Sequence, residues 1–344
     1  TNDVGCSQTI EDWENTDWNN INFDNWDKVD DTQKVESEPE TKIWETPQYM
    51  FMRVAIGIWG NKLENVKETF LMFSNKAGTH ATPTLFNSGT LYPSLSSCFL
   101  LGTEDSLEGL FDTAKECALI SKRAGGIGLH LTNVRSKGSY IEGTGGKTDG
   151  IIPYIRVLNN VARFVNQSSK RNGSFAMYLQ PQHGDIMDFL GAMKTHGHED
   201  TLARDLYYGL WMPDLFMKQV KAKGKWFTFC SKAHKELNDL YGDEFERVYK
   251  LKVMRKEFLK SYEAVDIWNE IIKMQQNSGM PYICYKDAVN RKTNQQNVGT
   301  IQSSNLCAEI MEYSDSKETA VCNLASVRLQ SHLKENPNLT KLKE

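Results

Sequence analysis

The sequence predicts an α/β sheet or barrel, and two observations lead to this fold class. Short apolar strands and amphipathic helices alternate along most of the 344 residues, which is the pattern of repeated β–α units. Hydrophobic residues make up 40% of the chain and charged residues 24%, a globular composition. A chain of this length can bury a substantial core, either as one large barrel or as two domains.

The ordered part is expected to begin near residue 45, because Thr46 fits a helix N-cap and Pro47 a first helical residue. A second helix is expected over 63–78, ending at Gly78. The alternation then predicts strands at 95–101, 127–131, 174–179, 206–212, 226–230 and 281–285. It predicts helices at 106–126, 151–165, 185–193, 213–223 and 264–276, and the segments 303–313 and 318–329 complete the series.

The two ends of the chain differ from this pattern. Residues 1–40 hold twelve acidic residues and two lysines, a balance of −10, so the remainder carries +6 of the total −4. We expect 1–44 to be a disordered acidic arm; the alternative is that Trp13, Trp18 and Trp26 dock on a partner. Residues 45–329 are expected to form the folded portion and 330–344 a polar tail.

Several functional classes are disfavoured by composition. There is no apolar run of membrane-spanning length and no signal peptide, and a +6 body is too weakly basic to indicate nucleic-acid binding. Seven cysteines without a CxxC motif suggest neither a secreted disulfide scaffold nor a zinc site. We therefore expect a cytoplasmic protein without a metal, and we interpret His196 and His198 as surface residues.

A glycine-rich stretch at 143–150 resembles a phosphate-binding loop but lacks its spacing. A Walker A motif that ends in Gly146-Lys147-Thr148 requires glycine at position 141, and Ile141 stands there. The sequence therefore does not predict a P-loop nucleotide hydrolase.

The segment 303–310 reads SSNLCAEI and places Asn305, Cys307 and Glu309 two positions apart. In an extended segment these three side chains would point the same way. A thiol can donate hydrogen or act as a nucleophile, and a neighbouring carboxylate can remove a proton from a substrate hydroxyl. Cys98 and Cys322, if the fold joins them, could supply two reducing equivalents by forming a disulfide. A strand that merely alternates polar and apolar residues is the alternative.

Five stretches together resemble the large, catalytic subunit of class I ribonucleotide reductase, in its eukaryotic or large-DNA-virus form: 81–101, 120–144, 203–217, 290–310 and 320–326. The resemblance implies the first half of a ten-stranded α/β barrel with a catalytic finger loop, preceded by helices. It implies reduction of ribonucleoside diphosphates to deoxyribonucleoside diphosphates by thiyl-radical chemistry. The radical would come from a separate small subunit, so this chain would bind no cofactor of its own.

The same resemblance assigns roles to the residues singled out above. It implies that Cys307 is the thiyl-radical cysteine that takes the 3′ hydrogen of the ribose, and that Glu309 is the base on the 3′ hydroxyl. Asn305 would hold the ribose hydroxyls, and Cys98 and Cys322 would be the dithiol that reduces C2′. The further implied substrate contacts are Thr82, Ser97, Gly125 and Gly126.

A specificity site for a deoxynucleoside triphosphate or ATP is also implied, at the interface of a homodimer. Its matched positions are Asp105, Ser106, Leu107, Lys122, Arg135, Glu142 and Gly143. A relay loop would contribute Gln167 and Arg171, although this loop is one residue shorter than the family pattern and carries Asn172 where proline is usual. Thioredoxin or glutaredoxin would be the external reductant.

Other family features have no match in the sequence: the N-terminal ATP cone, the diphosphate-binding loop, the radical-path tyrosines and the mobile C-terminal cysteines. We therefore expect the chain alone to bind a deoxynucleoside triphosphate weakly and to reduce nothing. Two alternatives stay open: a non-catalytic nucleotide-binding or regulatory fragment of a reductase, and part of a class II enzyme that uses adenosylcobalamin.

Overall fold

The computed structural model describes residues 45–91, 93–165 and 173–332. The chain divides into two units, Thr1–Thr46 and Pro47–Glu344, and the description below concerns the second. The expectations for the acidic arm, for Gln167 and for Arg171 lie outside the described residues.

The central feature is a six-stranded mixed sheet with the order β8-β5-β4-β3-β2-β9. Five strands run parallel: β2 (Cys98–Gly102), β3 (Gly126–His130), β4 (Phe175–Leu179), β5 (Tyr207–Met212) and β8 (Tyr282–Tyr285). The sixth strand, β9 (Ala320–Cys322), pairs antiparallel with β2. The predicted α/β class is therefore confirmed, as a mixed and mainly parallel sheet.

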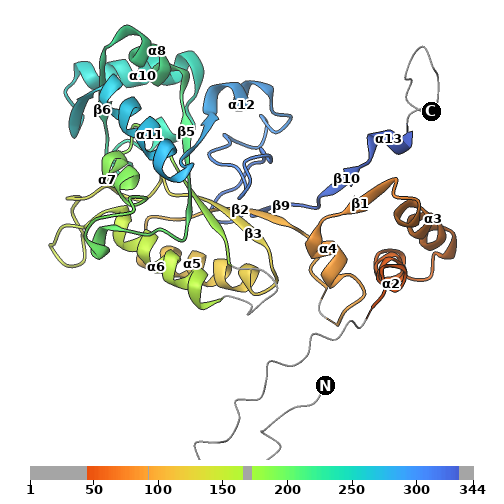
Figure 1. Cartoon of the computed structure of the whole chain (residues 1–344). Coiled ribbons are helices and arrows are strands. Elements are labelled where there is room, and N and C mark those ends of the chain that lie inside the picture. Colours follow the sequence, from red (N-terminus) through yellow and green to blue (C-terminus); the bar gives the residue numbers. More distant parts are fainter. Residues whose placement is uncertain (1–44, 92, 166–172, 333–344) are drawn as a thin grey trace, which may run out of the picture. The chain divides into compact units, whose positions relative to one another are not determined.

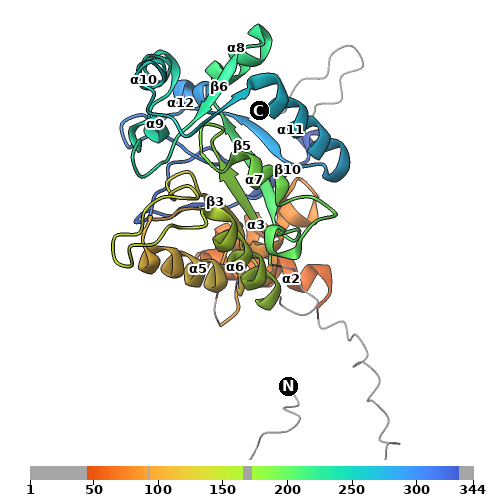
Figure 2. The ribbon, with the colours of Figure 1, turned by 90° about the vertical axis from the view of Figure 1, so that its left-hand side faces the viewer.

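Helices cover one face of the sheet because successive parallel strands need a crossover between them. Helix α5 (Leu107–Ser121) joins β2 to β3, and α6 (Ile151–Phe164) follows β3; the two lie side by side in Figure 1. Figure 2 shows α8 (Asp214–Ala222), α10 (Gly242–Met254) and β6 (Lys225–Thr228) gathered away from that pair. The remaining helices of this region are α7 (Ile186–Gly191), η3 (Glu199–Thr201), α9 (Glu236–Asp239), α11 (Ala264–Ser278) and α12 (Lys286–Lys292).

A smaller group of elements precedes the sheet in sequence. It contains α2 (Pro47–Trp59), α3 (Leu63–Ser74), β1 (Gly78–His80) and α4 (Thr82–Asn87). Strand β1 pairs antiparallel with β10 (Ala325–Val327), which follows β9, and α13 (Leu329–His332) comes next. Only two residues separate β9 from β10. The chain therefore connects this group directly to β9, the edge strand that pairs with β2.

The two faces of the sheet are buried by different partners. The helical face carries the main core, which includes Ile127, Leu129 and Met177 at alternate strand positions. The opposite face carries a smaller cluster in which Tyr178 and Trp211 pack with Leu306, from the loop that follows α12. The segment 301–310 packs on this second face, and this packing positions the candidate site.

Several local expectations were wrong. Helix α3 ends at Ser74 and Gly78 begins a strand, because Asn75 takes the C-cap position. The strand predicted at 226–230 forms a separate two-stranded sheet with β7 (Lys260–Glu263) instead of joining the main sheet. Helix α10 was not predicted, since only Phe245 and Tyr249 of its thirteen residues are fully buried and its apolar stripe is narrow.

Within the described part of the chain, no helix has both the length and the apolar character needed to cross a membrane.

Candidate active site and effector site

The 301–310 segment lies directly on β3 because two glycines of that strand leave room for it. A Cβ atom at Gly128 would lie 1.9 Å from the carbonyl oxygen of Ser304. A Cβ atom at Gly126 would lie 3.0 Å from a methyl group of Leu306. Any side chain at 128 would therefore push the backbone of the segment off the strand.

Three buried side chains of the sheet and of α12 hold the segment in place. The Tyr178 hydroxyl donates to the carbonyl of Asn305 at 2.7 Å, and Trp211 Nε1 donates to the carbonyl of Ile301 at 2.8 Å. Asn290 accepts from the Ile301 N–H at 2.8 Å and donates to the Ile301 carbonyl at 3.0 Å. Sequence reasoning missed all three anchors, although a tyrosine and a tryptophan in otherwise apolar strands usually need a hydrogen-bond partner.

The expected extended conformation of 303–310 is wrong. The chain turns at Leu306 and Cys307, and the next residue, Ala308, has φ +64°. Asn305 is fully buried, whereas Cys307 is exposed, so the two side chains do not share one face. The left-handed conformation at alanine is strained by about 1–3 kcal/mol, a feature that gathers at functional sites.

The turn brings Asn305 and Glu309 together by hydrogen bonds. The Asn305 amide oxygen accepts the N–H groups of Glu309 at 3.0 Å and Ile310 at 3.1 Å, and its nitrogen donates to Glu309 Oε1 at 2.7 Å. The same nitrogen lies 3.1 Å from Cys98 Sγ. One amide therefore joins the loop carboxylate to a thiol on β2.

Cys98 and Cys322 are register partners on the adjacent antiparallel strands β2 and β9. The expected adjacency of the two cysteines is therefore observed, while their redox role stays a prediction. Burial raises the pKa of Cys98 to about 12, against an opposing contribution from the Asn305 hydrogen bond. Burial also raises the pKa of Cys322 above its ordinary value. Both cysteines are thus protonated thiols at neutral pH.

A cavity of about 430 Å³ lies between Cys98 and Cys307 and is also lined by three of the expected substrate contacts. Its lining includes Cys98 and Cys307 together with Thr82, Ser97 and Gly126. Ser97 is buried, and its hydroxyl has no hydrogen-bond partner within the described ranges. The cavity therefore offers two thiols and an unsatisfied hydroxyl to a small polar ligand.

Gly125 differs from Gly126 in that it does not line this cavity. A Cβ atom at Gly125 would lie 2.6 Å from both the Phe99 ring and the Ile120 side chain. The glycine therefore permits close packing between β2 and the end of α5. Of the six expected substrate contacts, Thr82, Ser97 and Gly126 line the cavity, whereas Gly125, Asn305 and Glu309 do not.

Iodoacetamide at pH 8.5 is expected to modify Cys307 well before Cys98 and Cys322. Alkylation requires a thiolate and access to the sulfur; Cys307 is exposed, whereas burial raises the pKa of the other two thiols. Mass spectrometry of peptides from a time course measures the order. Modification of Cys98 at a rate equal to that of Cys307 would contradict the buried, protonated thiol described here.

Three of the expected effector positions, Asp105, Ser106 and Arg135, follow the carboxyl ends of β2 and β3. Arg135 donates from Nε to Asp105 Oδ2 at 2.7 Å and from its backbone N–H to Asp105 Oδ1 at 3.1 Å. Ser106 is the N-cap of α5 and accepts the Gly109 N–H at 3.0 Å. Because ligands of open parallel sheets bind beyond the carboxyl ends of the strands, these residues occupy a favourable position for a nucleotide.

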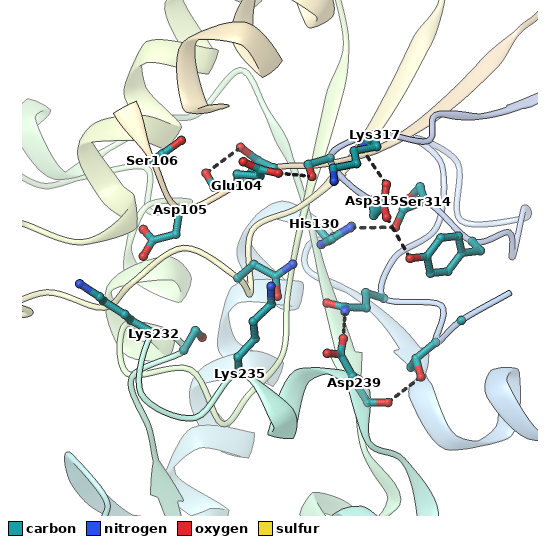
Figure 3. A pocket seen from close by; sticks show the side chains of 18 residues that line it. Glu104, Asp105, Ser106, His130, Lys232, Lys235, Asp239, Ser314, Asp315 and Lys317 are labelled. Carbon is teal, nitrogen blue, oxygen red and sulfur yellow. Dashed lines mark hydrogen bonds between the residues drawn. The ribbon is translucent and has the colours of Figure 1, made fainter. Parts of the chain in front are cut away.

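Asp105 and Ser106 line a second cavity, of about 740 Å³, which Figure 3 shows from close by. Lys232 and Lys235 approach it from the side opposite Glu104 and Lys317. Lys232 also forms an ion pair with Glu142 at 2.5 Å, which lowers the pKa of that carboxyl. Sequence reasoning missed Lys232, because the strand that precedes it lies far from Glu142 in the chain.

Two other expected effector positions are less enclosed. Leu107 is 69% exposed, and a Cβ atom at Gly143 would meet nothing within 4 Å. Lys122 follows the far end of the fifteen-residue helix α5, about 24 Å from Ser106 along the axis. One copy of the chain therefore does not bring Lys122 and Asp105 to the same small ligand.

The described ranges contain no group of three or more His, Cys, Asp and Glu residues placed to hold a metal ion. His196 and His198 are exposed, and His198 lies 3.4 Å from the carboxylate of Asp200.

Comparison with known proteins gives two family matches that together cover most of the chain. The ribonucleotide reductase barrel domain matches residues 96–344, and the ribonucleotide reductase all-alpha domain matches residues 35–93. Similar proteins include the ribonucleoside-diphosphate reductase large chain 2 of Saccharomyces cerevisiae, 54% identical over 290 residues, which cover 84% of this chain and 33% of that protein.

The large subunits of Arabidopsis thaliana and Variola virus are also similar. The first is 50% identical over 293 residues, covering 85% of this chain and 36% of the plant protein. The second is 52% identical over 290 residues, covering 84% and 38%. The chain thus spans roughly a third of the length of these curated relatives.

Proposed function

This chain belongs to the ribonucleotide reductase family, as its motifs indicated, and we propose that it supplies the thiols and the effector-binding residues of a large chain that reduces ribonucleoside diphosphates. One observation carries the proposal. The 430 Å³ cavity joins Cys307 to Cys98, Cys98 pairs in register with Cys322, and Asn305 links Cys98 to the carboxylate of Glu309.

In the proposed reaction, Cys307 as a thiyl radical takes the hydrogen from C3′ of the ribose and returns it at the end. A separate small subunit supplies the radical, and this chain binds no cofactor for it. Glu309 accepts the proton of the 3′ hydroxyl, and Asn305 holds the ribose hydroxyls. The hydrogen bond from Asn305 Nδ2 to Glu309 Oε1 supports this assignment, because it orients one carboxylate oxygen and leaves the other for a substrate.

Cys98 and Cys322 supply the two electrons of the reduction. The C2′–O bond breaks, the hydroxyl leaves as water, a C–H bond forms at C2′, and the two thiols become one disulfide. The raised pKa values of both thiols support this role, because protonated thiols can provide hydrogen to the substrate. Thioredoxin or glutaredoxin would then restore the dithiol.

Thr82, Ser97 and Gly126 are proposed to contact the substrate from the wall of the cavity. The buried Ser97 hydroxyl supports this, since an unsatisfied buried polar group gains a partner when a polar ligand enters. Gly125 is assigned an indirect part, because it allows the chain to pass closely behind Gly126.

We propose that a deoxynucleoside triphosphate or ATP binds the effector positions at the interface of two copies of this chain. Leu107, Phe111 and Leu119 are 69%, 59% and 56% exposed and lie four and eight positions apart along α5, so they form one apolar stripe. If two α5 helices pack antiparallel through this stripe, Lys122 of one copy lies near Asp105 of the other. Gln167 and Arg171 remain the proposed relay residues.

A chimaera in which this chain replaces the corresponding segment of the S. cerevisiae large chain 2 tests the proposal. It is expected to reduce ribonucleoside diphosphates when the small subunit and a dithiol reductant are added, with the unmodified yeast chain as the control. In parallel, calorimetry with dTTP and dGTP measures effector binding by the chain alone. A folded chimaera without turnover would overturn the catalytic assignment, and absence of triphosphate binding would overturn the effector assignment.

A further inference from the structure

Asp185 directly precedes α7 but does not cap that helix. Its side chain is almost completely buried, and its carboxylate accepts hydrogen bonds from two backbone N–H groups elsewhere. The Lys137 N–H lies 2.9 Å from Oδ1 and 3.2 Å from Oδ2, and the Ile151 N–H lies 3.1 Å from Oδ2. A buried carboxylate is stable when its oxygens are satisfied in this way.

The two donors are the ends of one loop, residues 137–151, which contains the expected effector positions Glu142 and Gly143. Inside the loop the chain pairs with itself: the Gly138 N–H donates to the Thr148 carbonyl at 2.8 Å, and the Thr148 N–H donates to the Ser139 carbonyl at 2.9 Å. These bonds hold the loop as a narrow hairpin. Arg135, Lys232 and Cys230 contact the middle of the loop, at Tyr140, Glu142 and Ser139. The Asp185 carboxylate instead holds both of its ends.

The Ile151 N–H also belongs to the first residue of α6, so Asp185 caps a helix that is distant in sequence. Gly150 occupies the N-cap position, where it has φ +77° and no side chain with which to cap. A Cβ atom at Gly150 would lie 2.2 Å from Asp185 Oδ2. The glycine thus leaves the space that the carboxylate fills, and the negative charge is favourable at a helix N-terminus.

His183 fixes Asp185 from the other side. The Asp185 N–H donates to His183 Nδ1 at 3.1 Å, so this nitrogen is unprotonated and His183 Nε2 donates to the Val134 carbonyl at 2.7 Å. Burial lowers the pKa of His183, which keeps the neutral form that both bonds require. The turn at 183–185 therefore holds three points of the chain: His183 binds the Val134 carbonyl, next to Arg135, and Asp185 binds both ends of the loop.

We propose that Asp185 is a positioning residue for effector binding: it ties the loop that carries Glu142 and Gly143 to the first turn of α6. A displacement of the loop by a bound triphosphate would pull on the same carboxylate that caps α6. This inference rests on the proposed function, because it assigns a ligand to the loop.

Asp185→Asn tests the inference with little change in shape. The asparagine amide has no charge, and its NH2 group would face the N–H group of either Lys137 or Ile151. One end of the loop therefore loses its hydrogen bond to residue 185. We expect dTTP and dGTP to bind about tenfold more weakly, as for the loss of a charge-assisted hydrogen bond. Ribonucleoside diphosphate binding is expected to stay unchanged, because the 430 Å³ cavity is lined by other elements. Calorimetry measures both affinities.

Asp188→Asn is the matched control, since Asp188 lies in α7, three residues after Asp185, and is exposed. Hydrogen exchange of the Lys137 and Ile151 amides provides a readout that does not depend on nucleotide. Both amides are expected to exchange faster in Asp185→Asn and at the parent rate in Asp188→Asn. In Gly150→Ala the new methyl group would displace the Asp185 carboxylate. This variant is expected to show the same faster exchange of both amides as Asp185→Asn.

The possible results separate this inference from the proposed function. If the parent chain binds triphosphate and Asp185→Asn binds it equally well, the positioning role is wrong. Equal weakening of triphosphate and diphosphate binding would show a general structural effect and would also overturn it. If the parent chain binds diphosphate but no triphosphate, the effector part of the proposed function fails, and this inference fails with it.

Discussion

Cys307→Ser in the chimaera is expected to reduce turnover to background. The O–H bond of serine is considerably stronger than the S–H bond of cysteine, so serine cannot serve as the hydrogen-abstracting radical. The substitution removes no hydrogen bond between Asn305, Glu309 and Cys98, which are joined without Cys307. Effector affinity is therefore expected to remain at the parent value. Deoxyribonucleotide formation over time measures the loss.

Cys230→Ser controls for the general effect of replacing a thiol, because Cys230 is half-buried and contacts Ser139 outside the 430 Å³ cavity. It is expected to keep turnover close to that of the parent chimaera. Residual turnover by the Cys307→Ser chimaera above the level without small subunit would show that another group starts the reaction, and the assignment of Cys307 would be wrong.

Gly128→Ala is expected to have the largest effect on stability of any single methyl group added to the sheet. The new Cβ atom would lie 1.9 Å from the Ser304 carbonyl oxygen, a backbone atom that has no rotamer with which to avoid it. Overpacking of this kind destabilises by about 1–3 kcal/mol or more. At about 3 kcal/mol, Tm decreases by roughly 6–12 °C for a unit of this size. Turnover in the chimaera should decrease as well, because Asn305 must move with Ser304.

Two glycine variants provide a graded comparison. At Gly126 the nearest atom is a Leu306 methyl group at 3.0 Å, which can rotate away, so Gly126→Ala should lower Tm less. At Gly191 a Cβ atom meets nothing within 4 Å, so Gly191→Ala should leave Tm and turnover unchanged. Differential scanning calorimetry measures the series. An unchanged Tm for Gly128→Ala would mean that the 301–310 segment does not lie on β3.

The local sequence was sufficient to predict the fold class and most strands of the sheet. Strands β2 to β5 were predicted correctly because both of their faces are buried, so each appears as a continuous apolar run. Helices with a broad apolar stripe, such as α6, were predicted because their buried residues recur with the period of a helix. Family motifs also identified the cysteine pair, and the register of β2 with β9 places Cys98 beside Cys322.

The conformation of 303–310 shows where such reasoning failed. Alternation of polar and apolar residues predicted an extended segment with Asn305, Cys307 and Glu309 on one face. The chain forms a turn instead, because the Asn305 amide oxygen accepts the N–H groups of Glu309 and Ile310, while Tyr178 of β4 donates to the Asn305 carbonyl. Period-two spacing describes a side-chain pattern, but the bonds of the Asn305 amide within the segment and the bond from Tyr178 outside it decided its backbone.

Sequence alone therefore established the family, the parallel β–α pattern and the residue types available for thiol and acid–base chemistry, because these depend on short motifs and on which local faces are apolar. Only the tertiary structure decided that one amide joins Cys98 to Glu309, that Gly128 admits the 301–310 backbone, and that Asp185 anchors both ends of a loop about forty residues earlier. Each of these is a contact between segments far apart in sequence. Such contacts form only when the sheet brings its strands together, so no local periodicity encodes them.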